Sequence, residues 1–117
     1  MQTIYRLEDS RGLGPYRYDS PLLLKYPMLH VDAEHPSWAQ ANGKWVDADE
    51  YFGFRTIELL LKWFEGYLIE AIEFGFNIVE VVVYNVELCR SGKQCLFNIN
   101  DVVSKRTCTV DYYPFVN

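Results

Sequence analysis

The chain has 117 residues, of which 50% are hydrophobic, and it carries a formal net charge of -5. A chain of this size and composition is expected to form one α+β domain over residues 1–117, since it can bury roughly two-thirds of its unfolded surface in a single core. Its 11 Lys and Arg are scattered among 16 Asp and Glu. This balance argues against direct nucleic-acid binding, which requires a basic face.

The cysteine pattern and the hydropathy predict a cytoplasmic protein. Cys89, Cys95 and Cys108 are odd in number and have no C-x-x-C spacing, which favours reduced thiols over a secreted disulfide framework. No run of about 18 apolar residues is present, and the N-terminus has no basic segment followed by an apolar one. We therefore expect neither a membrane span nor export.

The N-terminal part predicts one strand, Thr3–Glu8, followed by a long irregular loop that ends near Glu50. Loops of this length in compact domains are usually functional. Its aromatic residues can anchor a protein partner, and its acidic residues can steer the approach of a basic one. The predicted partner-binding residues are Tyr16, Tyr18, Trp38, Trp45, Asp47, Asp49 and Glu50. The alternative is that the aromatic residues pack the loop onto its own core.

The segment from Thr56 to Phe74 has the periodicity of an amphipathic helix. Its apolar residues share a stripe roughly 100° wide, made of Ile57, Leu60, Leu61, Phe64, Leu68 and Ala71. Thr56 is placed as the N-cap, and Gly75 as the residue that ends the helix. Gly66 interrupts the polar face while the stripe stays in phase. The pattern is compatible with one helix or with two abutting ones, Thr56–Glu65 and Tyr67–Phe74.

The sequence of the C-terminal part predicts strands that are joined by tight turns. Ile78–Val86 is apolar on both faces, which is typical of a central strand that is covered on each side. A turn at Arg90–Lys93 and a strand at Gln94–Ile99 follow. We expect Asn100–Lys105 to turn the chain into an edge strand, Arg106–Tyr112. The predicted fold class is therefore α+β, a mixed, mostly antiparallel sheet with the long helical segment packed on one face.

Local motifs do not complete a catalytic or metal site. Gly12-Leu13-Gly14 follows a strand, but Pro15 removes a backbone N–H that a dinucleotide phosphate would need. The potential ligands His30, Asp32, Glu34 and His35 lie in a loop, where such clusters are more typical of solvated polar residues or caps. We therefore expect no bound metal.

Three segments together resemble ADP-ribosyltransferase domains. Ile4-Tyr5-Arg6 is similar to their first-strand arginine motif, Phe52–Thr56 (FGFRT) to their small-hydroxyl strand, and Lys93–Phe97 (KQCLF) to the segment of their catalytic glutamate. The resemblance implies that Arg6, Thr56 and Gln94 occupy NAD-binding positions. Gln94 stands where the family has its glutamate, and a glutamine cannot supply that charge. The resemblance thus implies a degenerate, non-catalytic descendant, with an NAD-dependent mono-ADP-ribosyltransferase that modifies a host protein as the alternative.

Over Ile4–Tyr16 and Tyr51–Phe97, the chain also looks like small proteins carried by bacteriophages and prophages. Proteins of that origin commonly bind and block a host defence or regulatory protein, and anti-CRISPR inhibitors are among them. This resemblance implies a non-catalytic interaction protein with a host protein as its partner and no cofactor. A further hypothesis is a structural or self-associating protein, such as a homodimer.

Overall fold

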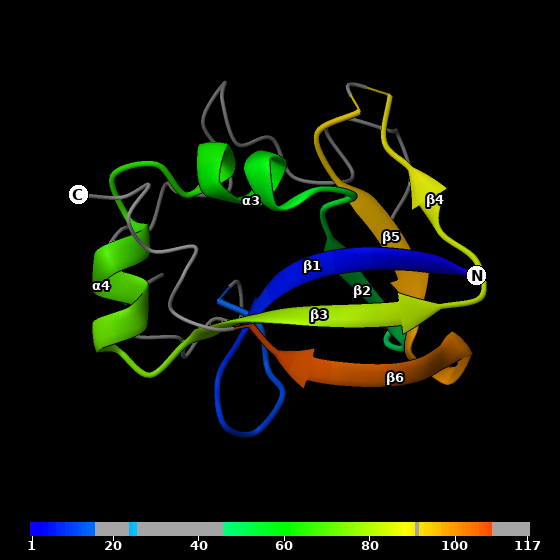
Figure 1. Ribbon diagram of the computed structural model, residues 1–117, viewed down its shortest axis with the longest axis horizontal. Coiled ribbons are helices and arrows are strands. Elements are labelled where there is room, and N and C mark those ends of the chain that lie inside the picture. Colours follow the sequence, from blue (N-terminus) through cyan, green and yellow to red (C-terminus); the bar gives the residue numbers. More distant parts are fainter. Residues whose placement is uncertain (16–23, 26–45, 91, 109–117) are drawn as a thin grey trace.

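The computed structural model describes residues 1–15, 24–25, 46–90 and 92–108. Most of the regular structure in this part of the chain is β-strand (Figure 1). The strands are β1 (Gln2–Glu8), β2 (Glu50–Gly53), β3 (Asn77–Val83), β4 (Glu87–Leu88), β5 (Cys95–Asn98) and β6 (Val102–Thr107). The helices are α3 (Ile57–Trp63), α4 (Leu68–Glu73) and the 3₁₀ helix η1 (Ile99–Asp101).

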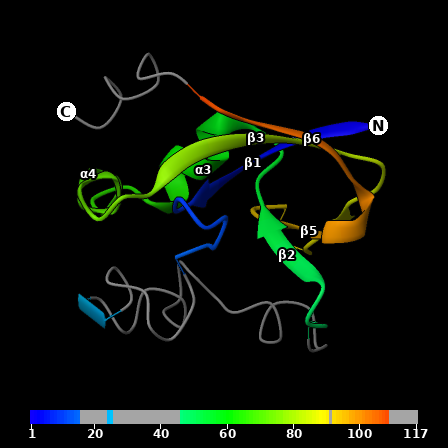
Figure 2. The ribbon, with the colours of Figure 1, turned by 90° about the horizontal axis from the view of Figure 1, so that it is seen from below.

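The strands form two antiparallel sheets. The first sheet has the order β1-β3-β6 and the second β2-β5-β4. Figure 2 shows β1, β3 and β6 as one layer and β2 and β5 as another. In the described part of the chain, an isolated bridge outside the strand pairings links the layers: Tyr5 of β1 and Phe54, the residue after β2, exchange two backbone hydrogen bonds of 2.7 Å. The two sheets therefore meet at a seam between β1 and the end of β2.

Alternate residues of β1 and β3 face the second sheet. In the register, Ile4 lies opposite Val81 and Arg6 opposite Val79, so these side chains share one face. The resulting apolar cluster contains Ile4, Val79, Val81, Val83, Cys95 and Phe97. Its members come from both sheets, so this cluster holds the two layers together.

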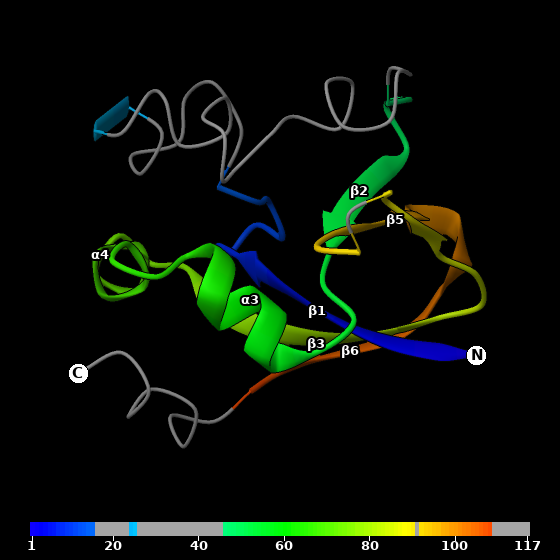
Figure 3. The same cartoon turned by 90° about the horizontal axis from the view of Figure 1, so that it is seen from above.

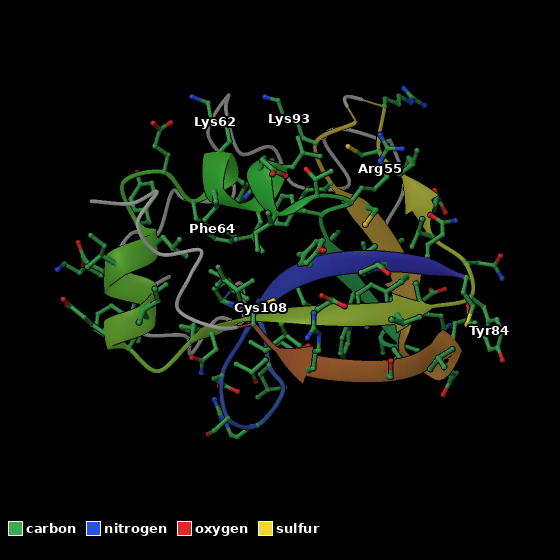
Figure 4. All side chains as sticks on the ribbon, viewed as in Figure 1. Arg55, Lys62, Phe64, Tyr84, Lys93 and Cys108 are labelled. Carbon is green, nitrogen blue, oxygen red and sulfur yellow. The ribbon has the colours of Figure 1, made fainter. Side chains whose placement is uncertain are left out.

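The opposite face of the first sheet packs on the helices at one end. Leu7 and Ile78 point to this side, where α3 and α4 cover them. The buried cluster contains Leu7, Phe54, Ile57, Leu60, Trp63, Phe64, Leu68, Ala71, Phe76, Ile78 and Cys108. Figure 4 shows Phe64 and Cys108 at this helical end of the sheet, and Tyr84 at the other end.

The predicted fold class is wrong. Instead of one sheet with a long helix on one face, the chain forms two antiparallel sheets and two short α-helices of 7 and 6 residues. The helix breaks because Gly66 has φ +87°, a left-handed conformation that an α-helix does not contain. The sequence left open whether this segment forms one helix or two abutting helices, and the structure has two.

The apolar stripe itself is confirmed in large part. Ile57, Leu60 and Phe64 are buried, whereas Leu61 is only partly buried against the same cluster. Trp63, which the stripe omitted, is also buried. The Thr56 hydroxyl accepts a hydrogen bond of 3.1 Å from the Leu59 N–H, as an N-cap does.

The C-terminal strand lies earlier in the chain than predicted. The turn is η1, where the Asn98 side chain accepts a hydrogen bond from the Asn100 N–H, and β6 begins at Val102. β6 pairs only with β3 among the described strands, so it lies at the edge of the first sheet. Residues 100–105, expected to turn the chain, therefore belong mostly to a strand. No helix in the described part of the chain is long and apolar enough to cross a membrane.

Candidate binding pocket

A pocket of about 180 Å³ lies at the seam between the two sheets. Its wall is mainly apolar, with Leu7, Leu13, Pro15, Phe52, Phe54 and Phe64 around it. Polar groups come from Arg6, Glu50, Tyr51 and Gln94, and the backbone of Gly14 completes the lining. A concave apolar surface with a few convergent polar groups is the usual form of a binding site.

The seam exists because β2 approaches β1 very closely at Gly53. A Cβ at this position would lie 2.9 Å from Ile4 Cδ1 and 3.2 Å from the Tyr5 carbonyl oxygen. Only glycine avoids both contacts. In Figure 3, β2 points toward β1, and the chain after β2 passes β1 before it enters α3. The pocket therefore collects residues from β1 and β2, together with Phe64 just after α3, that are distant in sequence.

The Asp9 turn builds another wall of the pocket. Its carboxylate accepts hydrogen bonds from the backbone N–H groups of Arg11, at 2.8 Å, and Leu13, at 3.1 Å. The Asp9 N–H in turn donates to the Leu13 carbonyl at 2.9 Å. These bonds fold the chain back after β1 and bring Leu13 and Gly14 beside Arg6.

Arg6 is the buried one of the two charged residues that line the pocket, Arg6 and Glu50, and its side chain is only 8% exposed. Nη1 donates a hydrogen bond of 2.9 Å to the Phe52 carbonyl. Cζ lies 5.0 Å from the centre of the Tyr51 ring and 5.7 Å from that of Phe97, distances that allow cation–π attraction. Burial lowers the pKa of Arg6, while Glu8 and Tyr51 act to raise it. A guanidinium remains charged under such conditions.

Arg6 belongs to a chain of three charged side chains. Its Nε lies 2.7 Å from Glu8 Oε2, an ion pair without the alignment of a hydrogen bond. Glu8 Oε1 lies 2.7 Å from Lys105 Nζ. Glu8 is buried, whereas 39% of the Lys105 side chain is exposed. A buried carboxylate is thus shared between a pocket residue and the edge strand β6.

Gln94 lines the pocket from the residue before β5. Its backbone N–H donates to Cys89 Sγ at 3.2 Å, and its carbonyl accepts from the Cys89 N–H at 3.0 Å. The neighbouring Cys95 is fully buried. Burial, together with Cys89, raises the pKa of Cys95 to about 12, although Arg55 and a backbone hydrogen bond from Gly53 oppose the shift. Cys89, Cys95 and Cys108 are all free and buried.

The structure brings some of the predicted site residues together. Arg6, Gln94 and Glu50 line the same pocket. Thr56 is absent from its lining, and its hydroxyl caps α3. Asp47 and Asp49 are exposed in the turn before β2, where the Asp47 N–H donates to Glu50 Oε1 at 2.9 Å.

The four aromatic residues of the predicted partner surface, Tyr16, Tyr18, Trp38 and Trp45, lie outside the described residues, as do His30, Asp32, Glu34 and His35. Within the described part of the chain, no three His, Cys, Asp or Glu side chains gather as a metal site would require.

Sequence reasoning missed Glu8 and Lys105. Residues two apart in a strand lie on the same face, so the position of Glu8 two residues after Arg6 was enough to identify the pair. Lys105 carries no such local signal, because it reaches Glu8 only through the pairing of β6 with β3.

Comparisons with known proteins gave one family. Searches of curated proteins and of solved structures returned no significant match. The family model for the bacteriophage T4 Y00F protein matches residues 1–111. This match spans β1 to β6 and every residue that lines the pocket. It confirms the resemblance to phage proteins, and the chain belongs to the bacteriophage T4 Y00F protein family.

Proposed function

We propose that this phage-family protein is a non-catalytic binding protein that holds an anchor side chain of a host protein in the pocket around Arg6. The observation that carries the proposal is the seam pocket itself, with apolar walls and a buried guanidinium in its floor. The host protein would be a defence or regulatory protein, and binding would block it, as anti-CRISPR inhibitors do.

The pocket suits an apolar or aromatic anchor. An aromatic side chain that buries about 150 to 250 Å² contributes roughly 4 to 6 kcal/mol before the costs of association are subtracted. One or two such anchors commonly carry most of the binding energy of an interface. A single aromatic anchor in this pocket would therefore contribute substantially to the binding free energy.

The acidic residues beside the pocket have a separate role in this proposal. Asp47 and Asp49 are exposed, and Glu50 connects them to the pocket lining. Exposed charges mainly raise the association rate of an oppositely charged partner, and salt screens this effect. We expect the association rate with a basic host protein to fall as salt concentration rises.

Capture from a host lysate tests the proposal with matched variants. Leu13→Glu puts a charge into the pocket wall, whereas Leu88→Glu puts the same charge on β4, where Leu88 is 44% exposed and does not line the pocket. Leu13→Glu should lose the captured protein with an unchanged melting temperature, and Leu88→Glu should retain it. Equal capture by both variants would exclude the pocket as the binding site.

The second candidate function is an NAD-dependent mono-ADP-ribosyltransferase that modifies a host protein. It is favoured by one observation: Arg6 and Gln94, two of the NAD-binding positions that the resemblance implies, line one pocket together with the Glu50 carboxylate. In this reaction the bond between ribose and nicotinamide breaks, and a host side chain, on losing a proton, bonds to the ribose.

Radiolabelled NAD separates the two functions. A non-catalytic binder transfers no label to host protein. Gln94→Glu introduces the glutamate that ADP-ribosyltransferase domains have at this position. If the pocket supports the reaction, this variant should transfer label even when the unmodified chain does not. If the unmodified chain transfers label, and Glu50→Gln abolishes the transfer without lowering the melting temperature, then the transferase replaces the binder.

A further inference from the structure

We infer that Glu8 and Lys105 are positioning residues that hold the Arg6 guanidinium with its Nη2 group toward a hydrogen-bond acceptor, most favourably a carboxylate, on the molecule in the pocket. The inference rests on the proposed function, since it concerns the same pocket. It adds a chemical requirement for the anchor and assigns a role to two residues that do not line the pocket.

The three side chains form a continuous connection across the first sheet. Lys105 lies on β6, and Arg6 and Glu8 lie on β1, with β3 between the two strands. The Lys105–Glu8 and Glu8–Arg6 distances are both 2.7 Å. Glu8 is thus held from two sides, and the position of its carboxylate fixes where Arg6 Nε lies.

The donors of Arg6 can be counted. A guanidinium has five N–H groups in a planar fork. Nε faces Glu8, Nη1 donates to the Phe52 carbonyl, and the rings of Tyr51 and Phe97 lie within cation–π distance of Cζ. Within residues 1–15, 46–90 and 92–108, Nη2 makes no hydrogen bond; a Cβ on Gly14 would lie 3.0 Å from it.

The charges point to an anionic acceptor. Because Glu8 is shared, Arg6, Glu8 and Lys105 together carry a net charge of +1. Without Lys105, the buried Glu8 would neutralise Arg6 alone. A charge-assisted hydrogen bond to a carboxylate is about twice as strong as a neutral one.

Side-chain ¹⁵N NMR of the full chain, with benzoate as the probe, tests the inference. Benzoate offers a flat apolar body and one carboxylate, and benzyl alcohol is the uncharged control. In the unmodified chain, Arg6 should show slow rotation of its guanidinium, and benzoate should shift its Nη signals more than benzyl alcohol does. Lys105→Met should weaken benzoate binding on the order of fivefold, and Lys105→Arg should restore it.

Arg106→Met is the matched control. Arg106 lies beside Lys105 on β6, and its ion pair is with Glu80, at 2.9 Å, not with Glu8. The Arg106→Met variant should leave both the Arg6 signals and benzoate binding unchanged. A second variant, Gly14→Ala, crowds Nη2 directly and should weaken benzoate binding while Lys105 is intact.

Two results would overturn the inference: Arg6 signals that do not respond to benzoate in the unmodified chain, or a Lys105→Met variant that behaves like Arg106→Met. Either result leaves the proposed function standing if Leu13→Glu still abolishes host-protein capture. Conversely, if Leu13→Glu has no effect on capture, the proposed function fails whatever benzoate does.

Discussion

The two faces of β1 serve different purposes. On the helical side, Leu7 enters a cluster that consists only of apolar residues and cysteine, and of this cluster Leu7, Phe54 and Phe64 also line the pocket. On the seam side, Arg6 and Glu8 are buried as charges. Well-packed apolar residues are often at least as stabilising as a buried ion pair. Stability therefore accounts for the helical face, whereas the seam face carries buried charges that binding explains better.

The largest effect is expected on the helical face, from Leu60→Ala. Leu60 is 0% exposed, so the change removes buried methyl groups and leaves a cavity, at a cost of roughly 2 to 5 kcal/mol of unfolding free energy. Leu61→Ala should cost clearly less, because Leu61 is only partly buried. Chemical denaturation measures both. Host-protein capture by the folded fraction should survive, since neither residue lines the pocket.

Arg6→Met tests the seam face directly. Removal of Arg6 leaves Glu8 buried with Lys105 alone, and loss of one partner of a buried pair costs roughly 3 kcal/mol. In the double variant Arg6→Met/Glu8→Leu, no unpaired charge remains on β1, and stability should return toward that of the unmodified chain. Capture of the host protein should be lost in both. A double variant that stays as unstable as the single one would mean that the pair is needed for folding.

Gly53→Ala should have an intermediate effect on the seam. The new methyl group would meet Ile4 Cδ1 at 2.9 Å, and overpacking of this kind costs roughly 1 to 3 kcal/mol. Ile4→Val removes Cδ1, so the double variant should recover part of the loss. Thermal denaturation measures the recovery. If Gly53→Ala is neutral, the close approach of β2 to β1 is not what closes the pocket.

The smallest effect at neutral pH concerns Cys95. Its folded-state pKa is about 12, against an ordinary value of 9.0. Between these values the unfolded chain loses the thiol proton and the folded chain keeps it, so stability should fall as pH rises from 9 toward 12. Denaturation of Cys95→Ala over this range should show a weaker fall. Below pH 9 the thiol should contribute no pH dependence.

The elements that the sequence predicted well are those with a local cause. Thr56 caps α3 because a hydroxyl before an apolar-periodic segment can accept a backbone N–H, whatever lies further along the chain. β1 follows from its alternation, and β3 from a run of residues that is apolar on both faces. Arg6 and Gln94 were chosen as site residues, and they share the pocket. By contrast, the stripe in phase across Gly66 suggested helical continuity that its left-handed backbone does not allow.

Local patterns were therefore sufficient for β1, β3, β5, the cap of α3 and most of its buried stripe, since periodicity and capping depend on neighbouring residues. The tertiary structure alone divides the strands into two sheets, because that division follows from which strands pair, and it brings the sheets together at the Tyr5–Phe54 bridge and at Gly53. It also decided that Lys105 meets Glu8. Residues nearly a hundred positions apart come into contact only through strand pairing, and no local pattern specifies that pairing.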